Sequence, residues 1–139
     1  MGHAALPPLL KPWLHRGVTS VVTFVCLHGA GKSRIAAALF NASAPPGWHA
    51  TSAGLEPQPE PSPAAAPMLA GEPAALAELD HSNPRPLDDN DSGLVIGIDC
   101  DISGAQCWQL AHQWPESAVL DELRDLTAGL ISNLSTEAQ

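Results

Sequence analysis

The sequence predicts a single α/β domain with a small, mostly parallel twisted sheet and helices on both faces. Two apolar stretches, residues 18–25 and 94–98, are rich in β-branched residues and have the length of buried strands. Helical patterns lie between and after these stretches, and strands that alternate with helices form parallel sheets. The length of 139 residues suits one domain with a single core. We expect this domain over residues 18–136, after a lead-in over residues 1–17.

The remaining elements follow from composition and spacing. Residues 33–40 are rich in alanine and leucine and predict a helix, which ends before the prolines that follow it. A short second strand is expected over residues 49–53. Residues 64–79 have a helical composition that two prolines and a glycine divide into pieces. Apolar residues at helical spacing over residues 117–134 predict the longest helix. The intervening loops are expected at residues 56–63 and 80–93.

Charge and cysteine content exclude several classes of partner. The chain has 6 Lys and Arg against 15 Asp and Glu, a formal net charge of -9. Such a surface repels nucleic acids and anionic membranes, so we exclude both as partners. No apolar run approaches the roughly 20 residues that span a bilayer, and three cysteines make a poor disulfide framework. We therefore expect a cytoplasmic protein with reduced thiols. The histidines lack paired ligand spacing near the cysteines, so neither a metal nor another cofactor is expected.

The segment between the first strand and the first helix predicts an oxyanion site. Residues 26–33 read Cys-Leu-His-Gly-Ala-Gly-Lys-Ser. One interpretation is a nucleotide-binding P-loop in which Cys26 replaces the first glycine, with residues 94–99 as the apolar strand that ends in a magnesium-binding aspartate. Another is a cysteine loop whose thiolate lies at its floor, beneath backbone N–H groups at a helix N-terminus. A tight strand-to-helix turn with a buried cysteine is the plain alternative. Cys26 favours the cysteine loop, which requires this residue.

Residues 24–39 resemble the low-molecular-weight protein tyrosine phosphatases and the arsenate reductases that share their fold. The loop of these proteins reads Cys, five residues, Arg, then Ser or Thr. Residues 51–54, Thr-Ser-Ala-Gly, resemble the Ser-Ala-Gly that follows the second strand in this family. Residues 84–87, the strand at 94–98, the Trp-Gln-Leu at 108–110 and the closing helix follow in the expected order. The resemblance covers residues 18–134 and favours the cysteine loop over the nucleotide loop.

The resemblance implies roles for the loop residues. Cys26 is the expected nucleophile toward phosphorus or arsenic, and Ser33 is expected to form a hydrogen bond with its thiolate. The backbone N–H groups of the loop are expected to hold the oxyanion oxygens. The residues that supply them are Leu27, His28, Gly29, Ala30, Gly31, Lys32 and Ser33.

The chain departs from the family pattern at the cation of the loop. Lys32 stands where the family has Arg, and it supplies a point charge instead of a planar fork that grips two oxygens. We therefore include Lys32 among the expected catalytic residues with altered geometry. Arg34, two residues along the helix, is the candidate to compensate, although we expect it to be a solvated surface residue.

The general acid is the second departure. The family has an Asp after the Trp-x-Leu segment to protonate the leaving oxygen, and here His112 stands near that position. Further candidates for the acid are Glu116, Asp99 and Asp101. Partly buried packing is the expected role of Trp48, Trp108 and Trp114.

Two more cysteines connect the chain with arsenate chemistry. Cys100 and Cys107 are seven residues apart, and the thioredoxin-coupled arsenate reductases have a second pair with this spacing. The resemblance thus implies a thiol relay from Cys26 through Cys100 to Cys107. The function expected first is hydrolysis of a phosphomonoester, on a phosphoprotein for example, through a cysteinyl-phosphate at Cys26. The alternatives are arsenate reduction with thioredoxin or a small thiol, a catalytically weak homologue that binds phosphate or arsenate, and, last, a P-loop nucleotide-binding protein.

Overall fold

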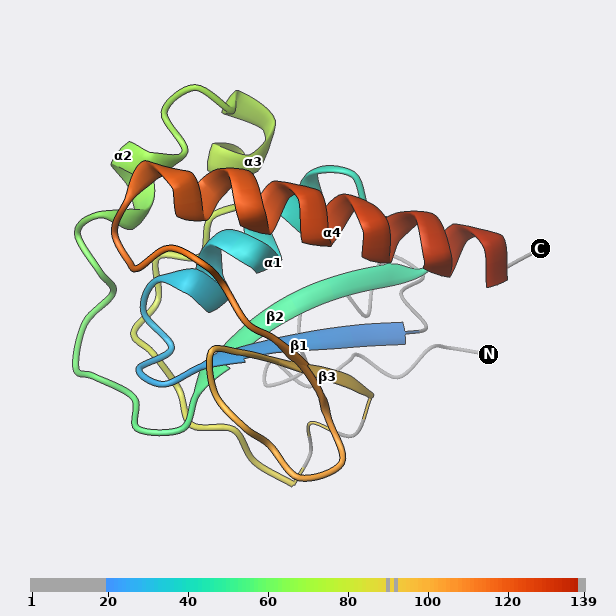
Figure 1. The fold of residues 1–139 in the computed structure, drawn as a ribbon, viewed down its shortest axis with the longest axis horizontal. Coiled ribbons are helices and arrows are strands. Elements are labelled where there is room, and N and C mark those ends of the chain that lie inside the picture. Colours follow the sequence, from blue (N-terminus) through green and yellow to red (C-terminus); the bar gives the residue numbers. More distant parts are fainter. Residues whose placement is uncertain (1–19, 90, 92, 138–139) are drawn as a thin grey trace, which may run out of the picture.

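The centre of the molecule is a four-stranded sheet in which all strands run parallel (Figure 1). The computed structural model describes residues 20–89, 91 and 93–137. The strand order is β2-β1-β3-β4. The strands are β1 (Ser20–Cys26), β2 (Trp48–Gly54), β3 (Leu94–Ile98) and β4 (Gln106–Trp108). The α/β class and the parallel pairing are confirmed, and β1 is an inner strand whose carboxyl end lies between those of β2 and β3.

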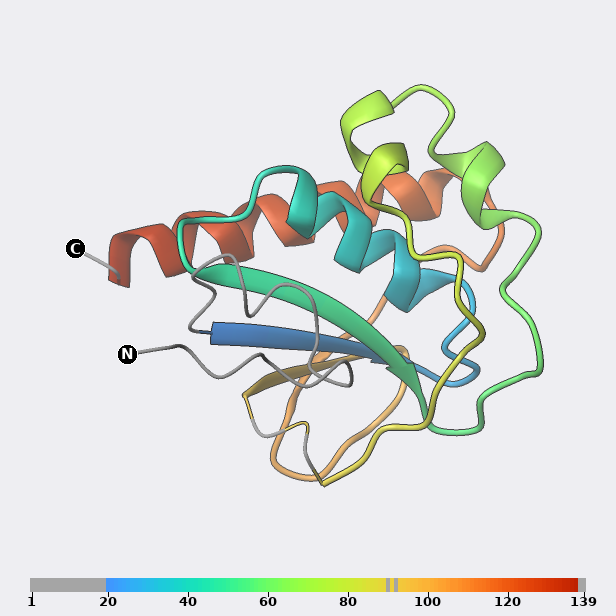
Figure 2. The same cartoon turned by 180° about the vertical axis from the view of Figure 1, so that it is seen from behind.

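The helices lie on one side of this sheet. They are α1 (Lys32–Ala42), α2 (Ala65–Met68), α3 (Pro73–Glu78) and α4 (Ser117–Glu137). Figures 1 and 2 show α1 against the sheet, α4 across α1, and the two short helices beside them. The sequence predicted helices on both faces, whereas the helices of the described residues all lie on the α1 side. Among these residues, no helix is both long and apolar enough to cross a membrane.

The core forms between α1, α4 and the face of the sheet beneath them. Side chains alternate between the faces of a strand, so Val22 and Phe24 of β1 point toward the helices together with Ile96 of β3. The ring of Phe24 lies 6.1 Å from that of Phe40 and 5.4 Å from that of Trp108, measured between ring centroids. These three aromatic side chains thus pack together where β1, α1 and β4 meet.

The element boundaries agree closely with the prediction. The strand at residues 94–98 is as expected, and the other predicted strands and long helices differ by a few residues at their ends. The stretch 64–79 forms two short helices with a break at residues 69–72. β4 was not predicted, because three residues with an exposed first side chain carry almost no strand pattern. The lead-in expected over residues 1–17 lies outside the described residues.

Candidate active site

Cys26 is the last residue of β1, and Lys32 is the first residue of α1. In open parallel sheets, ligands bind at the carboxyl ends of the strands, which is where this loop lies. The thiol of Cys26 is buried, and its Sγ lies 3.2 Å from Oγ of Ser33, in the first turn of α1. The N-terminus of a helix stabilises negative charge on nearby groups. The expected contact between Cys26 and Ser33 is therefore present, beside the N-terminus of α1.

The carbonyl groups of the loop are turned toward the segment that follows β2. Backbone N–H groups of that segment donate to four of them, at N–O distances between 2.7 and 3.2 Å. The pairs are Leu55 with Cys26, Glu56 with Leu27, Gln58 with His28, and Ser62 with Ala30. The carbonyl of Gly29 accepts a hydrogen bond of 2.9 Å from Nε of Arg34. Five consecutive carbonyls, from residue 26 to residue 30, thus have partners outside the loop.

The orientation of these carbonyls determines that of the N–H groups. In a planar trans peptide the carbonyl of one residue and the N–H of the next point in opposite directions. The N–H groups of residues 27–31 are therefore turned to the inside of the loop, and those of residues 32 and 33 belong to the free first turn of α1. None of these seven N–H groups donates to another described residue. A ring of convergent N–H donors at a helix N-terminus is suited to a tetrahedral oxyanion.

A close approach of two glycines holds the loop against the end of β2. Gly29 has a φ of +64°, and a Cβ atom added to it would lie 2.8 Å from the backbone nitrogen of Gly54. A Cβ added to Gly54 would lie 2.6 Å from the nitrogen of Gly29. Both positions therefore require glycine. This contact is the physical reason for the Ser-Ala-Gly sequence at the end of the second strand.

Arg34 lies beneath the loop and not on the surface, so the expectation of a solvated side chain is wrong. The residue is only 2 % exposed. Besides Nε on Gly29, its Nη1 donates to the carbonyl of Asp80 at 2.8 Å. Burial lowers the pKa of Arg34, against the opposing effects of Asp80 and of the Cys26 thiolate. The guanidinium thus forms hydrogen bonds with two carbonyls, and through the one with Gly29 it supports the loop.

A cavity of about 310 Å³ opens at the loop. Cys26 and Lys32 line it, together with Asp99 from the end of β3 and Trp114 from the segment before α4. Nζ of Lys32 lies 2.8 Å from Oδ2 of Asp99, in an ion pair. The indole ring of Trp114 lies against Gly31, where an added Cβ would be 2.6 Å from the ring. Trp114 is therefore a wall of the cavity, a role that goes beyond the packing predicted for it.

The candidates for the general acid lie in different places. Nδ1 of His112 is 3.0 Å from Oε2 of Glu122, and His112 is not among the residues that line the cavity. Hydrogen bonds from the N–H of Ala111 and from His112 lower the pKa of Glu122. Glu116 accepts a hydrogen bond from the backbone N–H of Gln113, and the side chain of Asp101 is exposed. Of the four candidates, Asp99 is the one that lines the cavity.

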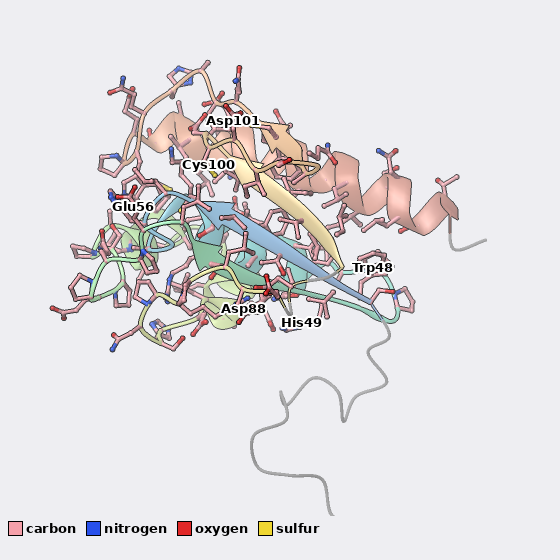
Figure 3. All side chains as sticks on the ribbon, turned by 90° about the horizontal axis from the view of Figure 1, so that it is seen from below. Trp48, His49, Glu56, Asp88, Cys100 and Asp101 are labelled. Atoms are coloured by element: carbon pink, nitrogen blue, oxygen red, sulfur yellow. The ribbon has the colours of Figure 1, made fainter. Side chains whose placement is uncertain are left out.

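The other two cysteines lie beside the end of β1. Figure 3 shows Cys100 and Asp101 just after β3. Sγ of Cys100 is 3.5 Å from the carbonyl oxygen of Val25, the residue before Cys26. The thiol of Cys107 donates to the carbonyl of Cys100 at 3.3 Å. Burial raises the pKa of the Cys100 thiol, and the negative charge of a Cys26 thiolate raises it further. All three cysteines are free. The relay between them was expected from the family resemblance together with the seven-residue spacing, and it stays a prediction.

The contacts between the loop and the rest of the molecule were not predicted. Gln58 and Ser62 support the loop through their N–H groups, and the indole N–H of Trp114 donates to Oγ of Ser62 at 3.3 Å. The ion pair of Lys32 with Asp99 joins residues 67 positions apart. A single sequence carries no signal for such pairings, and the proline-rich composition of residues 56–63 predicts only a loop.

Comparison with solved structures shows which class of protein has this fold. The thioredoxin-dependent arsenate reductase of Corynebacterium glutamicum matches with a TM-score of 0.69 and 24 % identity, over 88 % of this chain and 64 % of that one. An arsenate reductase from Archaeoglobus fulgidus matches with a TM-score of 0.62 and 26 % identity, over 80 % and 98 %. An arginine phosphatase from Geobacillus stearothermophilus gives 0.67 and 20 %, over 86 % and 95 %. No protein-family model and no curated protein matches the sequence.

These matches define a class by fold: small α/β proteins that include arsenate reductases and phosphatases. The chain has the fold that arsenate reductases and low-molecular-weight protein tyrosine phosphatases share, as its sequence predicted. It spans only 64 % of the length of the Corynebacterium enzyme. Both kinds of enzyme are among the structural matches, so the fold by itself does not separate them.

Proposed function

We propose that the chain is an arsenate reductase in which Cys26 is the nucleophile and Cys100 and Cys107 form the resolving pair. The observation that carries this proposal is the grouping of three free cysteines beside one oxyanion loop. Cys100 contacts the carbonyl of Val25, and Cys107 contacts the carbonyl of Cys100. A hydrolase acting through Cys26 has no use for a second and third thiol at this place. The resemblance to a thioredoxin-dependent arsenate reductase supports the same function.

The first step is attack on arsenic in the loop. The Cys26 thiolate forms a sulfur–arsenic bond with arsenate, and one arsenate hydroxyl leaves as water after it takes up a proton. The N–H groups of residues 27–33 hold the remaining oxygens and stabilise the charge that develops on them. Ser33, 3.2 Å from Sγ, stabilises the thiolate before the attack.

The next step transfers an electron pair to arsenic, and the one after it moves the disulfide away from Cys26. The Cys100 thiolate attacks Sγ of Cys26, a Cys26–Cys100 disulfide forms, and the electron pair of the sulfur–arsenic bond leaves with arsenic as arsenite. Two sulfurs are thereby oxidised, and As(V) is reduced to As(III). The Cys107 thiolate then attacks Sγ of Cys100, which releases the Cys26 thiolate and leaves a Cys100–Cys107 disulfide. A dithiol protein such as thioredoxin reduces that disulfide and restores the enzyme.

The second candidate is hydrolysis of a phosphomonoester through a cysteinyl-phosphate at Cys26. The loop of N–H donors and the Cys26–Ser33 contact favour it as much as they favour arsenate reduction. The position of Asp99, the acid candidate that lines the cavity, argues against the hydrolase. Both carboxylate oxygens of Asp99 already accept hydrogen bonds within the protein, Oδ2 from Lys32 and Oδ1 from the N–H of Leu110, whereas a general acid must point its proton at the leaving group.

A trapping experiment separates the two functions. The Cys107→Ser variant, incubated with arsenate, is expected to accumulate the Cys26–Cys100 disulfide and to release one arsenite per chain. Mass spectrometry of peptides from a non-reducing digest measures the disulfide, with Cys100→Ser as the control that forms none. Arsenite production that needs a small thiol but neither Cys100 nor Cys107 would contradict the relay. Hydrolysis of an aryl phosphate, abolished by Cys26→Ser and with no arsenite formed, would replace this proposal by the phosphatase.

A further inference from the structure

The cation of the oxyanion cavity already has an anionic partner within the protein. Nζ of Lys32 donates to Oδ2 of Asp99 at 2.8 Å, and the two side chains are 21 % and 27 % exposed. Both residues line the cavity that contains Cys26. The Asp99 carboxylate therefore lies where it acts on the charge that Lys32 offers to an oxyanion.

Asp99 is held in place without the help of Lys32. Its backbone N–H donates to the carbonyl of Trp108 at 2.8 Å, and its Oδ1 accepts a hydrogen bond of 2.8 Å from the N–H of Leu110. Its φ of 55° lies in the left-handed region, which Asp and Asn tolerate better than other residues with a side chain. The carboxylate is thus a fixed acceptor, and Lys32, on a flexible stem, is the partner that can turn.

The charges of the cavity cancel. With histidine neutral, Lys32 and Asp99 are the two formally charged side chains among the described residues that line it. An oxyanion bound at the loop competes with Asp99 for the ammonium group. It also meets the repulsion of a second anion in the same cavity. Among the groups that line the cavity, the backbone N–H groups are then the remaining source of positive potential, with the buried Arg34 behind the loop.

We propose that Asp99 is a positioning residue that competes with the oxyanion for Lys32 and so weakens oxyanion binding. This inference rests on the proposed function only in requiring that a tetrahedral oxyanion binds at the loop. A substrate or product anion must displace Asp99 from Lys32. The binding free energy that it gains is therefore only the difference between its interaction with Lys32 and the interaction of Asp99 with Lys32. The pair therefore sets the affinity low and favours release of the product.

The test compares two charge-neutralising variants. Asp99→Asn keeps an oxygen for the N–H of Leu110 and a residue suited to positive φ, so that it removes only the charge. Asp101→Asn removes an exposed carboxylate two residues away, outside the cavity lining. Inorganic phosphate is the probe, and its dissociation constant is measured by titration calorimetry on the full chain. We expect Asp99→Asn to bind phosphate about fivefold more tightly than wild type, the factor for an ion pair that is partly exposed. Asp101→Asn is expected to be unchanged.

A double-mutant cycle tests whether Asp99 acts through Lys32. In a Lys32→Met background, Asp99→Asn is expected to change phosphate affinity less than twofold, since the shared cation is gone. A tightening of equal size in both backgrounds would show direct repulsion and overturn the proposal. Unchanged or weaker binding in the single variant would also overturn it, and loss of structure cannot mimic the expected gain in affinity. If neither wild type nor Asp99→Asn binds phosphate or arsenate, the proposed function itself fails.

Discussion

Arg34 is the residue that connects the oxyanion loop to the body of the protein. Its Nε holds the carbonyl of Gly29, and its Nη1 holds the carbonyl of Asp80, 46 residues away in sequence. No carboxylate oxygen of a described residue forms an ion pair with the guanidinium. The positive charge beneath the loop is therefore balanced only at longer range, by Asp80 and by negative charge on Cys26. An oxyanion bound at the loop, as proposed above, would gain from the same charge.

Replacement of Arg34 by methionine is expected to lower the free energy of unfolding by about 2 kcal/mol, because one buried and one partly buried carbonyl lose their donor while most of the volume is kept. Urea denaturation followed by circular dichroism measures this change. Arg124→Met is the matched control, since Arg124 is exposed and pairs with Glu72 and Asp121. Its expected loss is less than about 1 kcal/mol. Equal losses in the two variants would contradict the bracing role of Arg34.

The residues of the motif were easier to predict than those around it. Cys26 and Ser33 lie within one loop, so their spacing and the helix that follows were enough to predict their contact. The environment of Arg34 depends on Asp80, and that of Lys32 depends on Asp99. Both partners are distant in sequence. Asp99 comes close because it follows β3, which pairs with β1, and Asp80 because it follows α3, which packs against α1. The sequence therefore predicted the chemistry of the loop but not the partners of its cations.

At the scale of elements, the end of β2 is what shapes the loop. β2 pairs with β1 along its whole length, with Gly54 opposite Cys26. The chain then continues over residues 55–62. Backbone N–H groups of this segment donate to four of the loop carbonyls. Without these donors the carbonyls would turn inward as readily as the N–H groups. The oxyanion site is therefore a product of two strand ends and not of the loop sequence alone.

Substitution of Gly54 by alanine tests this dependence. The added Cβ would lie 2.6 Å from the nitrogen of Gly29 and 2.7 Å from the carbonyl carbon of His28, and backbone atoms cannot turn aside as a side chain can. We expect a loss of about 2 kcal/mol in the free energy of unfolding and weaker binding of phosphate. Gly71→Ala is the control, because nothing lies within 4 Å of its added Cβ. If Gly54→Ala behaves like Gly71→Ala in both measurements, the close approach does not shape the site.

The elements that periodicity predicts well are those with a long buried face. Helix α4 has buried residues at helical spacing, and β3 is an uninterrupted apolar run, so both were predicted close to their true ends. The short edge strand β4 follows from pairing with β3 and not from its own composition. The side of the sheet that a helix covers depends on the path of its connections, which local composition does not encode. The sequence pattern therefore gave no basis for deciding which face of the sheet each helix covers.

At the scale of the whole molecule, the sheet face opposite α1 is secured by a polar cluster. Thr23 of β1 points to this face, and its Oγ1 donates to Oδ1 of Asp91 at 3.2 Å. The two terminal nitrogens of Arg85 donate to both oxygens of Asp91, at 2.9 and 3.0 Å. The N–H of Asp88 adds a further bond of 3.0 Å. The Asp91 side chain is only 3 % exposed, so one carboxylate joins the loop before β3 to the centre of the sheet.

The acid stability of the chain is expected to depend on this carboxylate. Burial would raise the pKa of Asp91, but the hydrogen bonds from Arg85 and Asp88 and the Arg85 charge bring it below its ordinary value of 3.8. A lowered pKa in the folded state contributes stability that is present above pH 3.8 and is lost as the pH falls through the folded value. Asp91→Asn removes this contribution, so the variant should be less stable than wild type at pH 7, by about 2 kcal/mol.

That difference should shrink as the pH falls below 3.8. The net charge of -9 at pH 7 also changes on acidification, because carboxylates and histidines take up protons, and the resulting change in repulsion affects both proteins nearly equally. The effect of net charge therefore cancels when the two free energies of unfolding are subtracted. Urea titrations of wild type and Asp91→Asn at pH 7 and at a series of values below 4 measure the difference. A difference that stays constant over this range would mean that Asp91 contributes through packing, and not through its ionised form bound by Arg85.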